Sequence, residues 1–565
     1  MHLLGTIAGL TFIALAWLVP NHYPPWTSAW NDGAAGVGVL ILGSLVWFPR
    51  FKTSTTLTLC FPVATGISLL ALALQTLLGT LIFQGDGYVV ALYASLFLVA
   101  IWIGATLRQS PGALVPLHWL PQSWLVSALL SVGVALCQWT GAVSLGIFGL
   151  ELHATGARAV GNLAQPSQFA TVCFMGLASA LWLHTQARLG RVVLWLCAVT
   201  LMSGMLMAQS RVASMQMVVW TALGIWLAHR GGASSLRNTI FGLGLLYACA
   251  SIVWPDVVRI IGLDLPRSSQ SALLSGSMRL RIWALLTDAI VHTPLLGYGW
   301  LQVGWVQQLY SLQHPAAGDL FEHGHNIVLD LLTWNGVILG GATVTLVAWW
   351  FWRVTKERCD VINLGPLLLL AGVGAHAMVE LPLEYAYILI PSGLCVGFLD
   401  ATPRLKLPNL TIHPAISASV LAAGGIMFSV IAWDYVAAET SFRTLRMEAA
   451  RIGTDSIRME PPHLLVLDQL EAYMRFVATE ASPGMTASQL EEMRKVAHRY
   501  GYAPVLFRYA LASGLNGQPT EAQLTLQRLC QIHTPRRCHE AVEGWAALQT
   551  QYPELRGVKF TPHSP

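Results

Sequence analysis

Residues 88–106 read YVVALYASLFLVAIWIGAT, an uninterrupted run of 19 residues without a charged side chain. One helix crossing a bilayer core needs about 20 mostly apolar residues, so this run predicts a membrane-spanning helix. Of the 565 residues in the chain, 55% are hydrophobic and only 11% are charged, whereas soluble domains carry about 25% charged residues. This composition excludes a soluble enzyme with one appended anchor. A net charge of +4 without a basic block excludes a nucleic-acid binder.

Similar apolar segments follow one another along residues 1–433, several of them with internal Gly or Pro, which neighbouring helices accommodate in a membrane. We therefore predict an all-α, polytopic membrane protein with about 13 transmembrane helices. The predicted spans are residues 3–20, 33–48, 57–82, 88–106, 123–140, 168–185, 191–208, 212–228, 239–254, 327–352, 364–380, 383–399 and 414–433.

Basic residues are distributed unevenly over the connections between these spans, and this bias sets the orientation of a membrane protein. With a cytoplasmic N-terminus, twelve Lys and Arg residues fall in short cytoplasmic loops, whereas six fall on the opposite side, although its loops are longer. An odd number of spans then places the C-terminal region outside the cytoplasm. The twelve residues are Arg50, Lys52, Arg108, Arg188, Arg191, Arg230, Arg237, Arg353, Lys356, Arg358, Arg404 and Lys406.

The C-terminal region differs in composition from the rest of the chain. Residues 434–565 carry 14 Lys/Arg and 14 Asp/Glu, while the much longer stretch 1–433 carries 18 and 14. We predict a transmembrane domain over 1–433 and a soluble, helical periplasmic domain over 434–565. In the latter, Phe507–Leu515 and Ala522–Leu529 flank a Gly-Gln-Pro turn and resemble a tetratricopeptide-like pair, although an ordinary helical hairpin fits equally well. Such a unit binds protein segments or braces the membrane domain.

Two further features are predicted on the external side. Residues 255–326 form a connection too long to be passive, and we expect a structured periplasmic loop whose Met278–His292 portion is a helix that ends before Pro294. In the tail, Cys530 and Cys538 can form a short-loop disulfide in an oxidising compartment, or remain two buried thiols.

The first candidate site is Glu322-His-Gly-His-Asn326, directly before an apolar span. Asn326 can cap this helix, and the positive helix end would keep His325 neutral, ready to accept a proton, and would attract an anion such as phosphate. Two other interpretations remain open for His323 and His325. They can be histidines packed at a membrane interface, or ligands of a metal ion, although their spacing lacks further convincing ligands.

Arginine supplies the second candidate site. Only five of the 32 basic residues are Lys, so 27 are Arg, and the external connections of the membrane domain use Arg alone. Bidentate phosphate recognition is one reason for such residues, and interfacial snorkelling or pairing with Asp and Glu is the other. Arg279 and Arg281 are two apart, so a helix cannot direct both to one site. The six external residues are Arg158, Arg211, Arg259, Arg267, Arg279 and Arg281.

Two more polar stretches lie at the external ends of spans. In His376–Tyr387, the spacing of four between His376, Glu380 and Glu384 favours one helix face, except that Pro382 interrupts it. Ionisable residues there indicate either chemistry or an ion pair with an arginine. The amide-rich Gly161–Gln168 can contact substrate or cap the following helix.

These four elements, in this order, resemble the O-antigen ligase/polymerase superfamily of bacterial membrane glycosyltransferases, above all its PglL-type branch of protein O-oligosaccharyltransferases. The resemblance runs along nearly the whole membrane domain. Its pieces are Gly161–Gln168, Gln209-Ser-Arg211, Arg279–Trp283 with Pro294–Trp300, His323–Val328, and His376–Tyr387.

The resemblance implies a protein of the bacterial inner membrane that transfers a glycan from undecaprenyl diphosphate to an acceptor hydroxyl in the periplasm, with inversion and without a metal or other cofactor. Arg211 and Arg279 would neutralise the diphosphate leaving group, and His325 would activate the hydroxyl of a Ser or Thr in a pilin-like or other exported protein. Glu380 is the reserve base. Further expected substrate-binding residues are Arg158, Gln165, Arg281, His323, Asn326 and Tyr387.

Two departures and two alternatives accompany this prediction. The amide motif has Gln165-Pro-Ser-Gln where this branch commonly has an Asn-rich version, and Arg281 is an additional cation that can share the work of Arg279. O-antigen ligation or polymerisation would use the same donor chemistry. A transporter or flippase of lipid-linked sugars is the more distant alternative. The gathering of polar residues at one membrane face argues against it.

Overall fold

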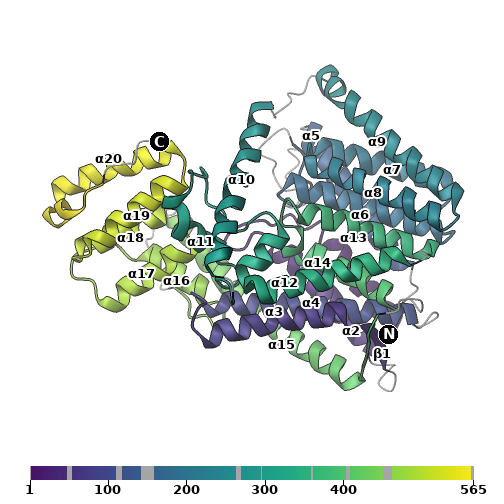
Figure 1. Ribbon diagram of the computed structural model, residues 1–565, viewed down its shortest axis with the longest axis horizontal. Helices are drawn as coiled ribbons and strands as arrows, with labels where there is room; N and C mark the ends of the chain where they lie inside the picture. The colour runs from purple at the N-terminus through teal and green to yellow at the C-terminus, as the bar shows by residue number, and fades with distance from the viewer. Residues whose placement is uncertain are drawn as a thin grey trace. The chain divides into compact units, whose positions relative to one another are not determined.

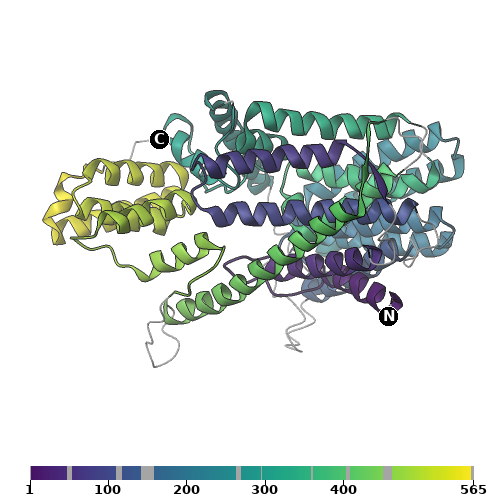
Figure 2. The ribbon, with the colours of Figure 1, turned by 90° about the horizontal axis from the view of Figure 1, so that it is seen from below.

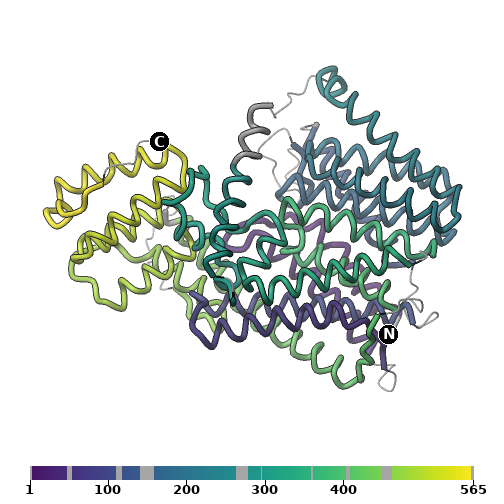
Figure 3. The backbone as a smooth tube through the Cα atoms, viewed as in Figure 1, coloured from purple at the N-terminus to yellow at the C-terminus, as the bar shows by residue number. Residues whose placement is uncertain are grey.

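The computed structural model describes residues 2–47, 54–109, 118–140, 158–261, 269–293, 295–357, 360–401, 407–449 and 461–560, and Figure 3 traces most of them in colour. Several predicted features lie outside the described residues. These are the loop cations Arg50, Lys52, Arg267, Arg358, Arg404 and Lys406, the end signal Pro294, and residues 141–157 and 262–268 of the external connections.

Among the described residues, an apolar helix overlaps each predicted span, and nine of these helices are long and apolar enough to cross a membrane. The chain is therefore a multi-pass, all-α membrane protein. The long helices are α2 (Ala29–Trp47), α3 (Cys60–Leu77), α4 (Gln84–Gln109), α5 (Trp119–Thr140), α6 (Pro166–Thr185), α8 (Arg211–Arg230), α9 (Ser234–Ile260), α12 (Ile327–Lys356) and α15 (Pro414–Ala449). The shorter ones are α1 (His2–Leu15), α7 (Arg191–Met207), α13 (Val361–Ala377) and α14 (Ala386–Asp400).

One small departure from the all-α prediction is a two-stranded antiparallel ladder. β1 (Thr55–Thr58) pairs with β2 (Asn409–Ile412), with Thr55 opposite Ile412. Both strands are four-residue segments in connections between helices, where extended backbone needs an outside hydrogen-bond partner. The ladder supplies that partner and leaves the helical architecture unchanged.

The described chain divides into two compact units. Unit 1 contains Met1–Thr65, Leu92–Ser268 and Thr345–Phe428. Its central helix is α6, which packs against α5, α7, α8 and α13 (Figure 1). Small residues allow this close packing, since a side chain added at Gly372 of α13 would collide with the ring of Phe174 in α6.

Unit 2 contains Gly66–Ala91, Ser269–Val344 and Ser429–Pro565. The predicted external helix is confirmed as part of α10 (Ser269–His292) and is followed by α11 (Val303–Tyr310) and the short 3-10 helix η2 (Ser311–Gln313). The tail helices lie side by side in Figures 1 and 2, each packed on the next. They are α16 (Asp468–Ala478), α17 (Ala487–Arg499), α18 (Ala503–Leu515), α19 (Pro519–Ile532) and α20 (Pro535–Gln551), followed by the 3-10 helix η4 (Pro553–Gly557).

The predicted helical pair in the tail is confirmed as α18 and α19, and the predicted disulfide is formed. Cys530 in α19 is bonded to Cys538 in α20, so the bond closes the turn between these helices. Trp545 of α20 is buried against Leu526 of α19 and Ala510 of α18. The last three helices therefore share one apolar core.

The start of the tail is tied to its later part, and the tail also contacts the external loop within unit 2. Asp434 in α15 is buried and accepts backbone N–H bonds from Leu465, Val466 and Leu467, at 3.0, 2.7 and 3.1 Å. Elements of the external loop pack on the tail, with α11 against α17 and η2 against α19.

A histidine lies in the contact between α11 and α17. The imidazole of His498 stacks on the indole of Trp305, with ring centroids 3.7 Å apart. Burial, which is the largest cause, and the cations of Arg494 and Arg528 together lower the pKa of His498 to about 3. An exposed histidine, with a pKa of 6.5, begins to take up a proton near that pH. His498 stays neutral there in the folded protein.

We predict that acid weakens this packing. Between pH 6.5 and 3 the unfolded chain binds a proton at His498 that the folded chain does not, so the free energy of unfolding falls as the pH falls. A change from pH 7 to 5 should lower it by about 2 kcal/mol through this residue. Thermal unfolding of the purified protein should show a smaller acid-induced decrease for His498→Phe, which keeps an aromatic ring on Trp305. An equal decrease in both proteins would contradict this assignment.

Candidate active site

The histidine loop of unit 2, residues 322–326, ends at the first turn of α12. The predicted cap is confirmed, because the side-chain oxygen of Asn326 accepts the N–H groups of Val328 and Leu329 at 3.0 and 3.2 Å. These are two of the backbone donors that a helix N-terminus leaves without intrahelical partners. Asn326 therefore fixes the end of the loop immediately after His325.

Gly324 holds the middle of the histidine loop. Its N–H donates to the carboxylate of Asp330 at 2.6 Å, and its carbonyl accepts the indole N–H of Trp283 at 2.7 Å. A side chain at position 324 would lie 2.8 Å from Leu286 Cδ1 and 2.9 Å from Asp330 Oδ1, so only glycine fits here without a shift. Asp330 and Trp283 were not among the residues predicted for the site. The signal for Asp330 was a carboxylate within a predicted span.

The two histidines have different surroundings. His325 is half-buried, has a left-handed backbone with φ of 51°, and presents its ring to the edge of Phe321 at a centroid distance of 5.5 Å. His323 lies against Trp334, with ring centroids 6.3 Å apart. Within the described ranges, no group of three His, Cys, Asp or Glu side chains has metal-ligand geometry. A left-handed backbone at a non-glycine residue is costly and often occurs at functional sites.

The two neighbouring arginines of α10 also differ. An N–H of Arg281 donates to the carbonyl of Ala316 at 2.5 Å, so this guanidinium braces the external loop. Arg279 is half-buried and lies two residues earlier on the same helix. Residues two apart diverge around a helix, in agreement with separate roles for the two cations.

In unit 1, Arg158 binds the tight turn that precedes Arg211. Arg158 donates to the carbonyls of Ala208 and Gln209 at 3.0 and 3.3 Å, and these carbonyls follow the end of α7. A cation at a helix C-terminus offsets its partial negative charge. Gln209 has φ of 47°, which reverses the chain so that Arg211 becomes the exposed first residue of α8. Arg158 therefore shapes the turn that presents Arg211.

The amide motif does not cap α6 through Gln165. Gln165 occupies the N-cap position, but its side chain makes no capping hydrogen bond and instead bonds to Tyr385. Burial raises the pKa of Tyr385, and the carboxylates of Glu384 and Glu380 raise it further. Tyr385 therefore remains a protonated hydroxyl among carboxylates. The structure thus brings Gln165, a predicted site residue, to the phenol of Tyr385.

The prediction that His376, Glu380 and Glu384 share one helix face is wrong. α13 ends at Ala377, and Glu384 belongs to the separate 3-10 helix η3 (Pro382–Glu384), because the proline removes a backbone donor. His376 is fully buried, and its Nδ1 lies 2.7 Å from the hydroxyl oxygen of Thr171. This contact is internal to the packing of α6 and α13.

A buried carboxylate that the sequence prediction missed lies beside Tyr387. Asp32, in the first turn of α2, accepts hydrogen bonds from the hydroxyls of Ser28 and Tyr93 at 2.5 and 2.8 Å, and from the N–H of Tyr387 at 3.3 Å. Tyr387 is 1% exposed, and its ring centroid lies 5.2 Å from that of Tyr385. Asp32 could have been found as an acidic residue at the start of an apolar span.

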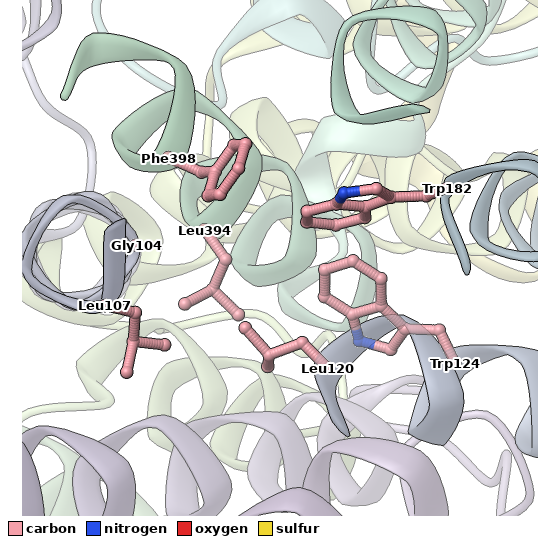
Figure 4. A pocket seen from close by; sticks show the side chains of 7 residues that line it. All are labelled: Gly104, Leu107, Leu120, Trp124, Trp182, Leu394 and Phe398. Carbon is pink, nitrogen blue, oxygen red and sulfur yellow. The ribbon is translucent and has the colours of Figure 1, made fainter. Parts of the chain in front are cut away.

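Unit 1 also contains an apolar pocket, formed near the other ends of α4, α6 and α14. Figure 4 shows a pocket lined by residues of α4, α5, α6 and α14, with the rings of Trp124 and Trp182 facing one another. These two rings are 6.4 Å apart between centroids. No predicted site residue lines this pocket. Its lining consists of Gly104, Leu107, Leu120, Trp124, Trp182, Leu394 and Phe398.

We predict that Trp283→Phe loosens the histidine loop. The substitution keeps an aromatic ring but leaves the Gly324 carbonyl without its indole donor, which costs about 1–3 kcal/mol for a buried group. Amide hydrogen exchange over residues 322–326 should therefore become faster. Leu280→Ala, at a residue 64% exposed on the same helix, is the control and should leave the exchange rate unchanged. Equal rates in wild type and Trp283→Phe would refute this role.

Comparison with known proteins identifies relatives along most of the chain. A family model described as protein glycosylation ligase matches residues 159–184, which include Gln165. A second model, described as virulence factor membrane-bound polymerase, C-terminal, matches residues 366–542.

Two curated proteins of Acinetobacter baylyi (strain ATCC 33305 / BD413 / ADP1) are similar to the chain. Its general O-oligosaccharyltransferase is 27% identical over 558 residues, which cover 94% of this chain and 93% of that protein. Its ComP-specific O-oligosaccharyltransferase is 22% identical over 509 residues, covering 89% and 90%. These matches confirm the resemblance carried by the motifs, and the chain is a membrane glycosyltransferase related to the PglL-type O-oligosaccharyltransferases of the O-antigen ligase/polymerase superfamily.

Proposed function

We propose that the chain transfers a glycan from an undecaprenyl-diphosphate-linked donor to Ser or Thr hydroxyls of exported proteins, such as pilin. The observation that carries this proposal is the similarity to two O-oligosaccharyltransferases over about nine-tenths of the chain. The match of the glycosylation-ligase model to residues 159–184 supports a protein acceptor.

The reaction would take place at the periplasmic face of the bacterial inner membrane, with the N-terminus in the cytoplasm and residues 434–565 in the periplasm. The excess of Lys and Arg in the short loops of the opposite side supports this orientation. The Cys530–Cys538 disulfide in the tail supports it independently, since such bonds persist in oxidising compartments.

In the proposed mechanism, His325 takes the proton of the acceptor hydroxyl. The hydroxyl oxygen forms a bond to the anomeric carbon as the bond from that carbon to the diphosphate oxygen breaks, with inversion. A neutral imidazole suits this proton transfer near neutral pH. The capped loop supports the role, because Asn326 and Gly324 hold the backbone on both sides of His325. Glu380 is the reserve base.

The leaving diphosphate carries away negative charge, which guanidinium groups stabilise well where water is scarce. We assign this task to Arg211 and Arg279, and we assign donor contacts to Gln165, His323 and Tyr387. Arg211 is supported by its place at the positive end of α8. Arg158 and Arg281 already bind backbone carbonyls, so we propose that they shape the site rather than contact phosphate.

We predict that His325→Ala abolishes glycan transfer from a purified lipid-linked donor to pilin. Loss of a general base lowers kcat by about 100-fold or more. His292→Ala is the matched control, since His292 is an exposed histidine at the end of α10, with 61% of its side chain accessible. Full activity of His325→Ala would remove the base assignment and leave Glu380 to be tested in the same assay.

We predict that Arg211→Lys and Arg279→Lys each lower kcat by about 10- to 100-fold with the donor at saturation. Lysine keeps the positive charge but cannot form the paired hydrogen bonds of a guanidinium to phosphate. Arg259→Lys is the control, because Arg259 is an exposed external arginine that pairs with Asp256 at 3.1 Å. Rates equal to that of the control would show that these cations serve only as surface charges.

The polymerase-model match over residues 366–542 favours a second candidate, polymerisation of O-antigen by the same donor chemistry. One assay distinguishes the candidates by offering the donor with pilin, with core lipid or with a second lipid-linked glycan. Transfer to pilin alone supports the proposal, and transfer only to a lipid-linked acceptor replaces it. Movement of donor across vesicle membranes without any transfer would instead indicate a transporter.

A further inference from the structure

The corner between α17 and α18 lies against the histidine loop within unit 2. Its sequence is Arg499-Tyr-Gly-Tyr502, and Tyr502 is the residue directly before α18. A side chain at Gly501 would lie 2.7 Å from the amide of Gln308 and 3.1 Å from Leu320, which precedes the loop by two residues. The carbonyl of Gly501 also bonds to the imidazole of His533 at 2.9 Å. The corner is therefore closely packed on both sides.

Arg499 anchors this corner to the start of α4. Its guanidinium donates two hydrogen bonds to the carboxylate of Asp86, at 2.6 and 3.1 Å. The exposed side-chain fractions of 13% for Arg499 and 5% for Asp86 place the pair in a poorly hydrated environment. A paired bidentate geometry of this kind is strong and specific, and loss of either partner leaves a buried charge.

Glu322, the first residue of the histidine loop, extends this pair into a polar group of four. Its carboxylate accepts a hydrogen bond from the hydroxyl of Tyr502 at 2.9 Å and lies 3.9 Å from the guanidinium of Arg499. Both contacts come from the tail, although Glu322 is about 180 residues earlier in the chain. The Glu322 side chain is 40% exposed, so the hydrogen bond from Tyr502 matters more than the longer ion pair.

Three residues therefore hold the histidine loop in place. Asn326 fixes its end through α12, Gly324 fixes its middle through Trp283 and Asp330, and Glu322 fixes its beginning through the tail. His325 lies between these points with a left-handed backbone, a conformation that persists only where the surroundings impose it.

We propose that Tyr502, together with Arg499, is a positioning residue for glycan transfer and acts through Glu322 on the loop that carries His325. This inference rests on the proposed function, since it assigns the tail a part in the catalytic step. The tail would then act on the rate with any acceptor, whether or not it also binds protein acceptors.

Other contacts keep the tail in place when the bond between Tyr502 and Glu322 is removed. Asp468 accepts the N–H groups of Gln84 and Gly85 at 3.2 and 2.7 Å, so a tail carboxylate caps the first turn of α4. The amide of Gln308 donates to the carbonyls of Ala497 and His498 at the end of α17. Loss of one hydroxyl should therefore change the histidine loop without separating it from the tail.

The test compares Tyr502→Phe, Glu322→Gln and the double variant in the full chain. We expect kcat to fall about five- to tenfold in Tyr502→Phe, with the KM values for donor and acceptor within about twofold of wild type. The double variant should be no slower than the slower single variant, because both changes break one interaction. Tyr552→Phe, at the end of α20, is the control and should retain full activity.

A second arm separates positioning from acceptor binding. Transfer to a short Ser-containing peptide and hydrolysis of the donor by water should both slow by the same factor as transfer to pilin. A defect confined to pilin would overturn the inference, because it would place Tyr502 in acceptor recognition.

A third arm is independent of activity. Amide hydrogen exchange over residues 321–326 should become about tenfold faster in Tyr502→Phe, while exchange within α18 and α19 stays unchanged. If wild type transfers no glycan to any acceptor, the proposed function fails, and the exchange measurement still decides whether the tail orders the loop. Unchanged exchange, or full activity of both single variants, would overturn the inference.

Discussion

Helix ends are the constraint on which this structure depends. Every α-helix leaves four N–H groups and four carbonyls without intrahelical partners, and a chain with only 11% charged residues has few side chains to satisfy them. The polar residues are accordingly placed at these ends. Asn326 caps α12, Arg158 binds carbonyls beyond α7, and Asp468 caps α4 from a distant part of the chain. Gln308 does the same for the last carbonyls of α17.

The same placement concerns both parts of the proposed chemistry, which are proton removal by His325 and stabilisation of the diphosphate by Arg211. The cap on α12 holds the backbone next to His325, and the contacts of Arg158 shape the turn that begins α8 with Arg211. Each helix start also concentrates partial positive charge, which suits an anionic diphosphate and disfavours a protonated base. In each unit, the contact that satisfies a helix end also fixes the backbone beside a residue proposed for the chemistry.

The tail is connected to other parts of unit 2 by polar contacts. Its last three helices share an apolar core, and the Arg499–Asp86 pair and the Tyr502–Glu322 bond connect the tail to the start of α4 and to the histidine loop. The mostly buried Arg499–Asp86 pair makes the association specific, because a misplaced tail would leave charges unpaired in a poorly hydrated environment.

The sequence by itself determined the helical membrane architecture, since long apolar runs have no other stable form in a bilayer. It also determined the cap at Asn326, because that bond joins residues two and three apart. Only the tertiary structure decided which polar residues meet. Trp283 and Gly324 are 41 residues apart, and Asp86 and Arg499 are 413 apart. No local pattern encodes such pairs, because they form only after the helices pack, and for the same reason Asp32 beside Tyr387 escaped prediction.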